Sequence, residues 1–144
     1  MKYGTLYSYW SHEWVCDYPA VAKKVRAAGC DILEVGAPHI AAMTDAQLAE
    51  LKAAAEDNGL ILTTNIGPSK DQDLASPDPA IRRNGLEFLT GVLRAMDKIG
   101  SKSLVGAMYS FWPCDFKYTD KEAAWDTSIA EMKKLAAVAE DLGI

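Results

Sequence analysis

Apolar residues follow two alternating patterns along this chain. Four short, mostly apolar runs have the length of β-strands, and they cover residues 2–8, 30–35, 60–64 and 101–105. Between the runs, apolar residues recur every three or four positions, as they do on an α-helix that buries one face. The pattern predicts four strands, each followed by a helix, with the strands covered on both faces because they are short and apolar.

Local signals mark where these helices begin and end. Glycine tolerates the left-handed conformation that closes a helix, and Gly29, Gly59, Gly100 and Gly143 each end a helical pattern just before an apolar segment. Residues 44–47 and 119–122 fit the capping box, in which a hydroxyl and a Gln or Glu satisfy free backbone donors. Asp78 precedes a proline at the first helical position, and Asp17 with Pro19 is a less clean instance.

A chain that repeats strand and helix in one order forms parallel strands with right-handed crossovers. Two architectures meet this condition: an open doubly wound sheet and a run of barrel units. A doubly wound nucleotide binder would place a glycine-rich loop after its first strand, but residues 8–14 are bulky and aromatic. We therefore predict an α/β fold of four consecutive βα units, the first half of a (β/α)8 TIM barrel. A complete barrel takes about 250 residues, so we expect 1–144 to be the N-terminal half of a single barrel domain, cut where a fifth strand begins.

Composition narrows the function classes. Fifteen Lys and Arg against twenty Asp and Glu give a net charge of −5, and no basic stripe stands out, which argues against nucleic-acid binding. No apolar run approaches the roughly 18 residues of a membrane span. The three cysteines form no CxxC pair, which is typical of a reducing compartment. We expect a cytoplasmic protein in which Cys30 and Cys114 are packing residues.

Aromatic residues gather where the predicted strands end, the edge at which parallel βα folds carry their functional groups. The set comprises Tyr7, Tyr9, Trp10, Trp14, Tyr109, Phe111 and Trp112. Flat aromatic faces suit the C–H faces of sugars and shield a site from water. The same rings could instead plug the mouth of a barrel, and the sequence leaves both interpretations open.

Two His–Glu neighbourhoods suggest a metal site, but weakly. Glu34 ends the second strand near His39, and Glu13 follows His12. A metal needs three or four converging ligands with second-shell support, and the two histidines belong to different loops. We predict no metal ligand here and interpret Glu34 as a polar group that hydrogen bonds near the pocket floor.

Several motifs, in order along the chain, resemble the ketose 3-epimerases, that is, the D-psicose (D-allulose) and D-tagatose 3-epimerases. They are the opening Met1-Lys2-Tyr3-Gly4 with Tyr7-Ser8-Tyr9-Trp10 and His12-Glu13-Trp14, then Asp31-Ile32-Leu33-Glu34-Val35, Asp57-Asn58-Gly59, Ile66-Gly67-Pro68, Ser76-Pro77-Asp78-Pro79 and the stretch 106–113. The resemblance spans essentially the whole chain. It implies a xylose-isomerase-like (β/α)8 barrel that interconverts free ketohexoses at C3 with a divalent metal, usually Mn²⁺ or Co²⁺.

The resemblance also assigns substrate-pocket positions. The family's pocket aromatics fall at Trp14 and Trp112, a small residue beside the sugar falls at Ala107, and Ile66 lies where the family lines the pocket after the third strand. Leu6 departs from the family, which usually has an aromatic there that closes over the far end of the sugar. This departure bears on preference at the distal carbons or on the packing of that wall.

The resemblance implies that the proton-transfer and metal-binding residues lie outside residues 1–144. In the family, two glutamates that move the C3 proton, and the two Glu-type carboxylates, Asp and His that hold the metal, lie on the fifth to eighth strands. We therefore expect no catalytic residue within 1–144 and no turnover from this chain alone. Alternatively, the chain is an inactive half-barrel that self-associates as a homo-oligomer to close its sheet, or it is simply the recorded part of a full enzyme.

Overall fold

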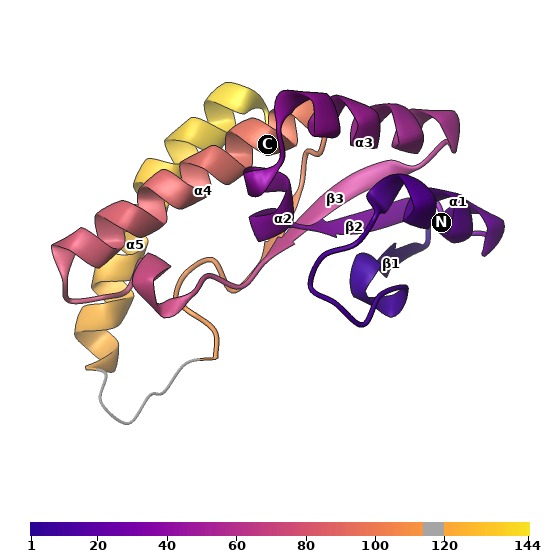
Figure 1. The fold of residues 1–144 in the computed structure, drawn as a ribbon. Coiled ribbons are helices and arrows are strands. Elements are labelled where there is room, and N and C mark those ends of the chain that lie inside the picture. Colours follow the sequence, from indigo (N-terminus) through magenta and orange to yellow (C-terminus); the bar gives the residue numbers. More distant parts are fainter. Residues whose placement is uncertain (114–119) are drawn as a thin grey trace.

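The fold alternates strands and helices, as the sequence predicts (Figure 1). It is known from a computed structural model that describes residues 1–113 and 120–144. The strands are β1 (Gly4–Leu6), β2 (Ile32–Gly36), β3 (Ile61–Ile66) and β4 (Leu104–Gly106). The helices are α1 (Tyr18–Ala27), α2 (Ala37–Ala42), α3 (Asp45–Asp57), α4 (Pro79–Ile99) and α5 (Lys121–Leu142), with 3-10 turns η1 (Tyr7–Tyr9) and η2 (Lys70–Gln72).

The four strands form one parallel sheet in the order β1-β2-β3-β4. The order never reverses, whereas a doubly wound sheet has a switch point at which it does. In register across the first three strands, Leu6 pairs with Glu34 and Glu34 with Thr63. The arrangement confirms four consecutive βα units in a parallel sheet, as predicted for the first half of a barrel.

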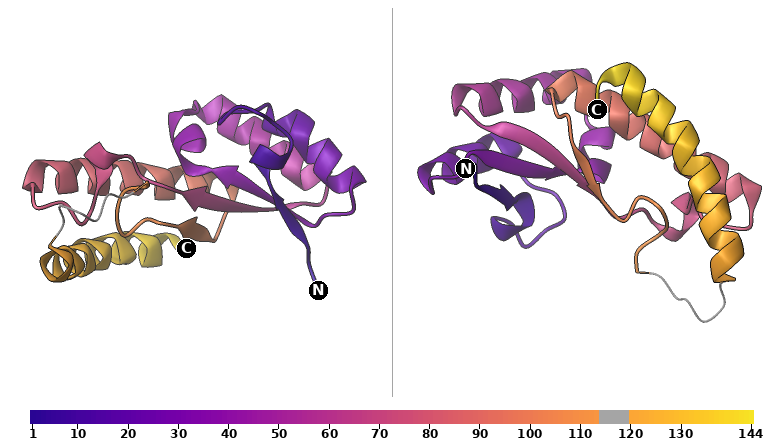
Figure 2. Two further views of the ribbon diagram at one scale, coloured as in Figure 1. Left: turned by 90° about the horizontal axis from the view of Figure 1, so that it is seen from below. Right: turned by 180° about the vertical axis from the view of Figure 1, so that it is seen from behind.

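Only one face of this sheet is covered by helices within the described ranges. Leu33, Leu62 and Thr64 point to that face and are buried. Figure 2 shows that α4 and α5 lie side by side. Side chains alternate along a strand, so the intervening residues point the other way, where Ile61 is 41% exposed and Val105 42% exposed. We call this side, with Leu6, Glu34, Ile61, Thr63, Asn65 and Val105, the open face. The expectation that the strands are covered on both faces is therefore wrong for this part of the molecule.

Most of the predicted helix boundaries are confirmed where the structure describes them. Thr44 and Gln47 form the reciprocal capping box at the start of α3, and Asp17 and Asp78 accept hydrogen bonds from the first turns of α1 and α4. The four predicted helix-ending glycines all have positive φ values, from 62° to 84°. The box predicted at 119–122 is wrong by one residue: Asp120 is the N-cap of α5 and accepts from the backbone N–H of Ala123 at 3.2 Å. Thr119 itself lies outside the described residues.

Two local features differ from the prediction. Helix α2 occupies residues expected to be loop, because its six residues are too few to show a helical period. The first strand is also shorter than predicted, since residues 7–9 turn into η1 and carry Tyr7 into the core, where it is 4% exposed.

Helix α5 is fastened to α4 by a half-buried ion network. Arg82 Nε lies 3.5 Å from a carboxylate oxygen of Glu131, which also accepts a 2.8 Å hydrogen bond from Lys134. Arg82 further donates to the carbonyl of Ser76 at 2.8 Å. No helix in the described part of the chain is both long and apolar enough to cross a membrane.

Candidate functional site

The loops after β3 and β4 meet at the carboxyl ends of the strands. The backbone N–H of Ala107 donates to the carbonyl of Ile66 at 3.0 Å. Gly106 permits this approach, because its φ is 119° and a Cβ there would lie 2.1 Å from the same carbonyl oxygen. Ile66 is the last residue of β3 and is buried, and Ala107 directly follows β4 and is half-buried.

Trp112 is placed at the same edge through its backbone. Its N–H donates to the carbonyl of Pro68 at 2.9 Å, which ties the β4 loop to the β3 loop. The indole itself is 65% exposed. A backbone held in place with a free ring gives a flat apolar surface that can cover a ligand.

Trp14, in the segment between β1 and α1, is likewise held through its backbone while its ring is exposed. The hydroxyl of Tyr7 donates to the carbonyl of Trp14 at 3.0 Å, while the Trp14 ring is 79% exposed. Tyr7 packs edge-on against Tyr18, with ring centroids 5.7 Å apart, and lies over Gly36, where a Cβ would contact its ring at 3.0 Å. Burial raises the pKa of Tyr7, which keeps its hydroxyl protonated and able to donate.

Glu34 lies on the open face and is half-buried. Its Oε1 accepts from Nδ2 of Asn65 at 3.2 Å, and its Oε2 accepts from the hydroxyl of Thr63 at 3.4 Å. A cavity of about 350 Å³ opens beside it, lined by Gly4, Thr5, Leu6, Ile32, Glu34, Thr63, Ser103 and Val105. Leu6 thus shares with Glu34 a cavity whose walls are both apolar and hydroxylic.

The histidines are not brought to Glu34. His39 lies in α2, with its ring 4.9 Å from that of Tyr18, and its Nδ1 is buried without a hydrogen-bond partner among the described residues. Burial lowers the pKa of His39, which favours the neutral ring. His12 is exposed on another loop. Within residues 1–113 and 120–144, no three His, Cys, Asp or Glu side chains converge as a metal site, so the described residues do not fit the metal that the resemblance implies.

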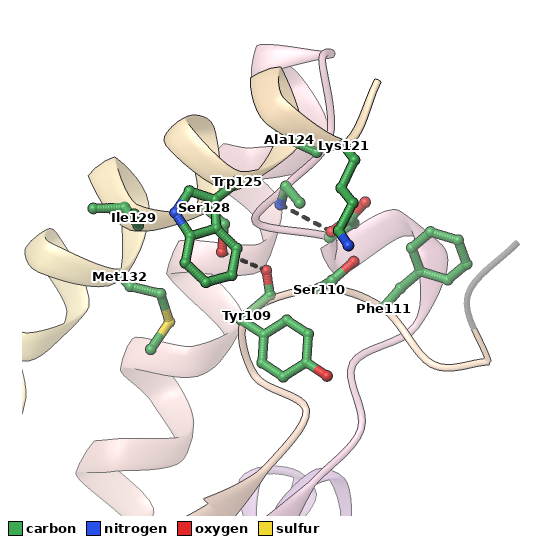
Figure 3. A pocket seen from close by; sticks show the side chains of 11 residues that line it. Tyr109, Ser110, Phe111, Lys121, Ala124, Trp125, Ser128, Ile129 and Met132 are labelled. Carbon is green, nitrogen blue, oxygen red and sulfur yellow. Dashed lines mark hydrogen bonds between the residues drawn. The ribbon is translucent and has the colours of Figure 1, made fainter. Parts of the chain in front are cut away.

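A second cavity, of about 520 Å³, lies between α5 and the loop after β4 (Figure 3). Tyr109, Trp125 and Met132 are among its lining residues, and Ser128 closes one side by donating a 2.6 Å hydrogen bond to the carbonyl of Tyr109. The sequence interpretation missed this cavity. Ile129 is 40% exposed and lines the cavity with Trp125. The four-residue spacing of Trp125 and Ile129 is the signal that could have indicated it.

The structure describes one of the two cysteines that were predicted to be packing residues. Cys30 is half-buried against the core, which agrees with a packing role, and Cys114 lies outside the described residues. Burial raises the pKa of Cys16 to about 11, so this thiol is a poor nucleophile near neutral pH.

Comparison with known proteins places the chain in a family. Residues 22–144 match the family model described as xylose isomerase-like TIM barrel. Over its whole length the chain is 43% identical to the D-psicose 3-epimerase of Ruminiclostridium cellulolyticum and 41% identical to that of Agrobacterium fabrum, and it covers 50% of each relative. The crystal structure of D-psicose 3-epimerase with D-tagatose from Clostridium cellulolyticum superposes on the whole chain with a TM-score of 0.96 at 43% identity, again over 50% of that structure. The chain spans about half the length of the curated relatives it matches.

Proposed function

The chain belongs to the xylose isomerase-like TIM barrel family, and from this premise we propose that it supplies the N-terminal half of a metal-dependent ketose 3-epimerase. The substrates would be free ketohexoses of the D-psicose and D-tagatose type. The observation that carries the proposal is the match, at 43% identity over the entire chain, to a D-psicose 3-epimerase whose structure was determined with D-tagatose.

The exposed rings at the strand ends support this proposal. Trp14 and Trp112 are each fastened by a backbone hydrogen bond, and their indoles are free to cover the C–H faces of a sugar. Ala107 is joined to Ile66 by a backbone hydrogen bond at the same edge, and Leu6 lines the cavity beside Glu34. In the proposed site these five side chains exclude water and hold the ketose in one orientation.

Epimerisation at C3 removes a proton from one face of the carbon and returns one to the other face, so two bases are needed. A divalent metal, when bound, stabilises the oxygens of the enediolate. The described residues bring no such ligand set together. In our proposal, the two bases and the ligands for Mn²⁺ or Co²⁺ belong to the second half of the barrel.

A direct assay tests whether the catalytic bases belong to the second half of the barrel. The chain is incubated with D-fructose and Mn²⁺, and D-psicose is measured by chromatography, beside a version extended through four further βα units. We expect turnover only from the extended version. Formation of D-psicose by residues 1–144 alone would refute the assignment of the bases to the other half. An inactive extended protein would refute the epimerase assignment itself.

The tryptophan positions have their own test in the extended version. Replacing Trp14 or Trp112 by Ala should raise KM, because each change removes an apolar surface from the proposed sugar site. Trp125→Ala is the matched control, since Trp125 is 66% exposed and lines the other cavity. An unchanged KM in both site variants would remove these residues from the site.

Self-association is a second candidate function, favoured by the open face. Leu6, Ile61 and Val105 are 37%, 41% and 42% exposed there, and unpaired strand edges with exposed apolar surface drive association. A two-fold pair of half-barrels would cover both faces. Sedimentation velocity of the 144-residue chain should then show a dimer, and a compact monomer across the concentration range would contradict it.

A further inference from the structure

We propose that Asn65 contacts the sugar and helps to set substrate specificity, and that Glu34 acts as its positioning residue. In this assignment Oδ1 of Asn65 accepts a hydrogen bond from a hydroxyl of the bound ketohexose. The inference rests on the proposed epimerase function and deepens it, because it names a polar contact in a site whose other proposed members are apolar.

Asn65 lies near the carboxyl end of β3, at the edge of the sheet where the proposed sugar site lies. It is the last but one residue of β3, next to Ile66, and lies two residues beyond Thr63 on the same face. Glu34 pairs in register with Thr63, so it lies one layer deeper than Asn65. The order from the strand ends inward is therefore Asn65 first and Glu34 behind it.

The chemistry of the pair fixes the orientation of the amide. A carboxylate only accepts hydrogen bonds, so the NH₂ group of Asn65 must face Glu34, as the 3.2 Å contact shows. The Oδ1 of a planar carboxamide then points away from Glu34. Thr63 donates to the second carboxylate oxygen at 3.4 Å and restrains Glu34 in turn. No cation of the described ranges forms an ion pair with Glu34, so its partners there are neutral donors.

The polar atoms of Asn65 that Glu34 does not engage suit the hydroxyl groups of a ketohexose. The amide retains an acceptor at Oδ1 and one N–H donor, a combination that matches neighbouring hydroxyl groups. Leu6, in register with Glu34, has no polar group to offer a sugar. A site that hydrogen bonds a hydroxyl discriminates strongly against a sugar lacking it or presenting it differently. Asn65 thereby supplies a stereochemical contact on the same wall as Leu6.

Steady-state kinetics of the version extended through four further βα units, with Mn²⁺ and D-fructose, test the assignment. Asn65→Ala should raise KM by about three- to tenfold, the worth of one neutral hydrogen bond, and leave kcat within about twofold. Asn65→Ser, a smaller change, guards against a folding defect in the alanine variant. Asn84→Ala is the matched control, because Asn84 is exposed and its amide donates to the carbonyl of Asp71 instead.

The role of Glu34 is tested by a double-mutant cycle. Glu34→Ala should raise KM in the same way, and adding it to Asn65→Ala should cause no further rise, since a positioning residue acts only through its partner. Glu34→Gln retains an acceptor and should restore part of the affinity. A purely structural role would instead lower the melting temperature without this non-additivity.

The outcomes separate the two proposals. A polypeptide without epimerase activity would overturn the proposed function and, with it, this inference. An active polypeptide whose KM is unchanged by both Asn65 variants would overturn the sugar contact and leave the epimerase intact. Additive effects of the Glu34 and Asn65 changes would overturn the positioning role.

Discussion

The hydroxyl of Tyr18 accepts a 2.9 Å hydrogen bond from the backbone N–H of Gly36, and Tyr18 is fully buried. The bond joins the first turn of α1 to the last residue of β2. It satisfies a backbone donor that leaves the sheet at the strand end, where a buried and unpaired N–H would be costly. The edge that carries the proposed sugar site is thus held by a contact from the helix layer.

Removing this hydroxyl should destabilise the fold. Tyr18→Phe leaves the N–H of Gly36 buried without its acceptor, and we expect a loss of about 1–3 kcal/mol in the free energy of unfolding. Urea denaturation measures the change. Tyr3→Phe is the control, because Tyr3 is 62% exposed and its substitution should cost almost nothing. Equal midpoints for the two variants would contradict the role of the bond.

Stability should fall in mild acid because of His39. Burial lowers its pKa in the folded state, so the unfolded chain binds a proton that the folded chain resists. This contribution is complete above the unfolded pKa of about 6.5 and declines as the pH falls below it. Thermal unfolding from pH 7.5 to 5 should show that His39→Gln flattens the decline, whereas the same change at the exposed His12 leaves it in place. An unchanged pH slope in the His39 variant would refute this source.

Thr64 and Ser101 form a buried polar pair whose members should not be removed singly. Their hydroxyls are 3.0 Å apart and both side chains are fully buried. Thr64→Val leaves the Ser101 hydroxyl unpaired and should cost about 1–3 kcal/mol. The double variant Thr64→Val with Ser101→Ala removes both groups, so chemical denaturation should show a loss smaller than the sum of the single losses. Strictly additive losses would show that the two hydroxyls do not depend on each other.

The ion network between α4 and α5 should be held mainly by Arg82. Its side chain is only 22% exposed, pairs with Glu131 and donates to the carbonyl of Ser76, whereas Lys134 is 58% exposed. Arg82→Ala should therefore cost more stability than Lys134→Ala, for which we expect at most about 1 kcal/mol. Urea midpoints at low and high salt compare the two. A larger loss from the lysine variant would reverse this assignment.

Helix ends could be predicted because their signals are local. The carboxylates of Asp17 and Asp78 and the box of Thr44 with Gln47 act within three residues, so the sequence alone displays them. Helix α2 has Pro38 in its first turn, but its six residues span fewer than two turns and show no helical period. Its formation depends on packing against β2 and α4, which no local pattern records.

The candidate site was predictable as a place but not as a set of contacts. Parallel strands present their carboxyl ends on one edge, which is why Trp14, Ala107 and Trp112 could be assigned to one region. Ile66 was assigned there by the family resemblance. The hydrogen bond by which Tyr7 holds the backbone of Trp14 could not be foreseen, because it depends on η1 replacing the end of the predicted strand.

The sequence by itself determined the order of elements and the parallel sheet, because hydrophobic period, caps and crossover handedness are local or topological constraints. The barrel family followed from the resemblance of its motifs, in order along the chain, to a known family. Tertiary structure alone decided which side chains meet. Glu34 reaches Thr63 and Asn65 across 29 and 31 residues of chain, and a shift of one residue in strand register would turn these side chains to opposite faces. Register is set by the packing of the whole sheet against its helices, so the row that links Asn65 to Glu34 exists only once the fold is complete.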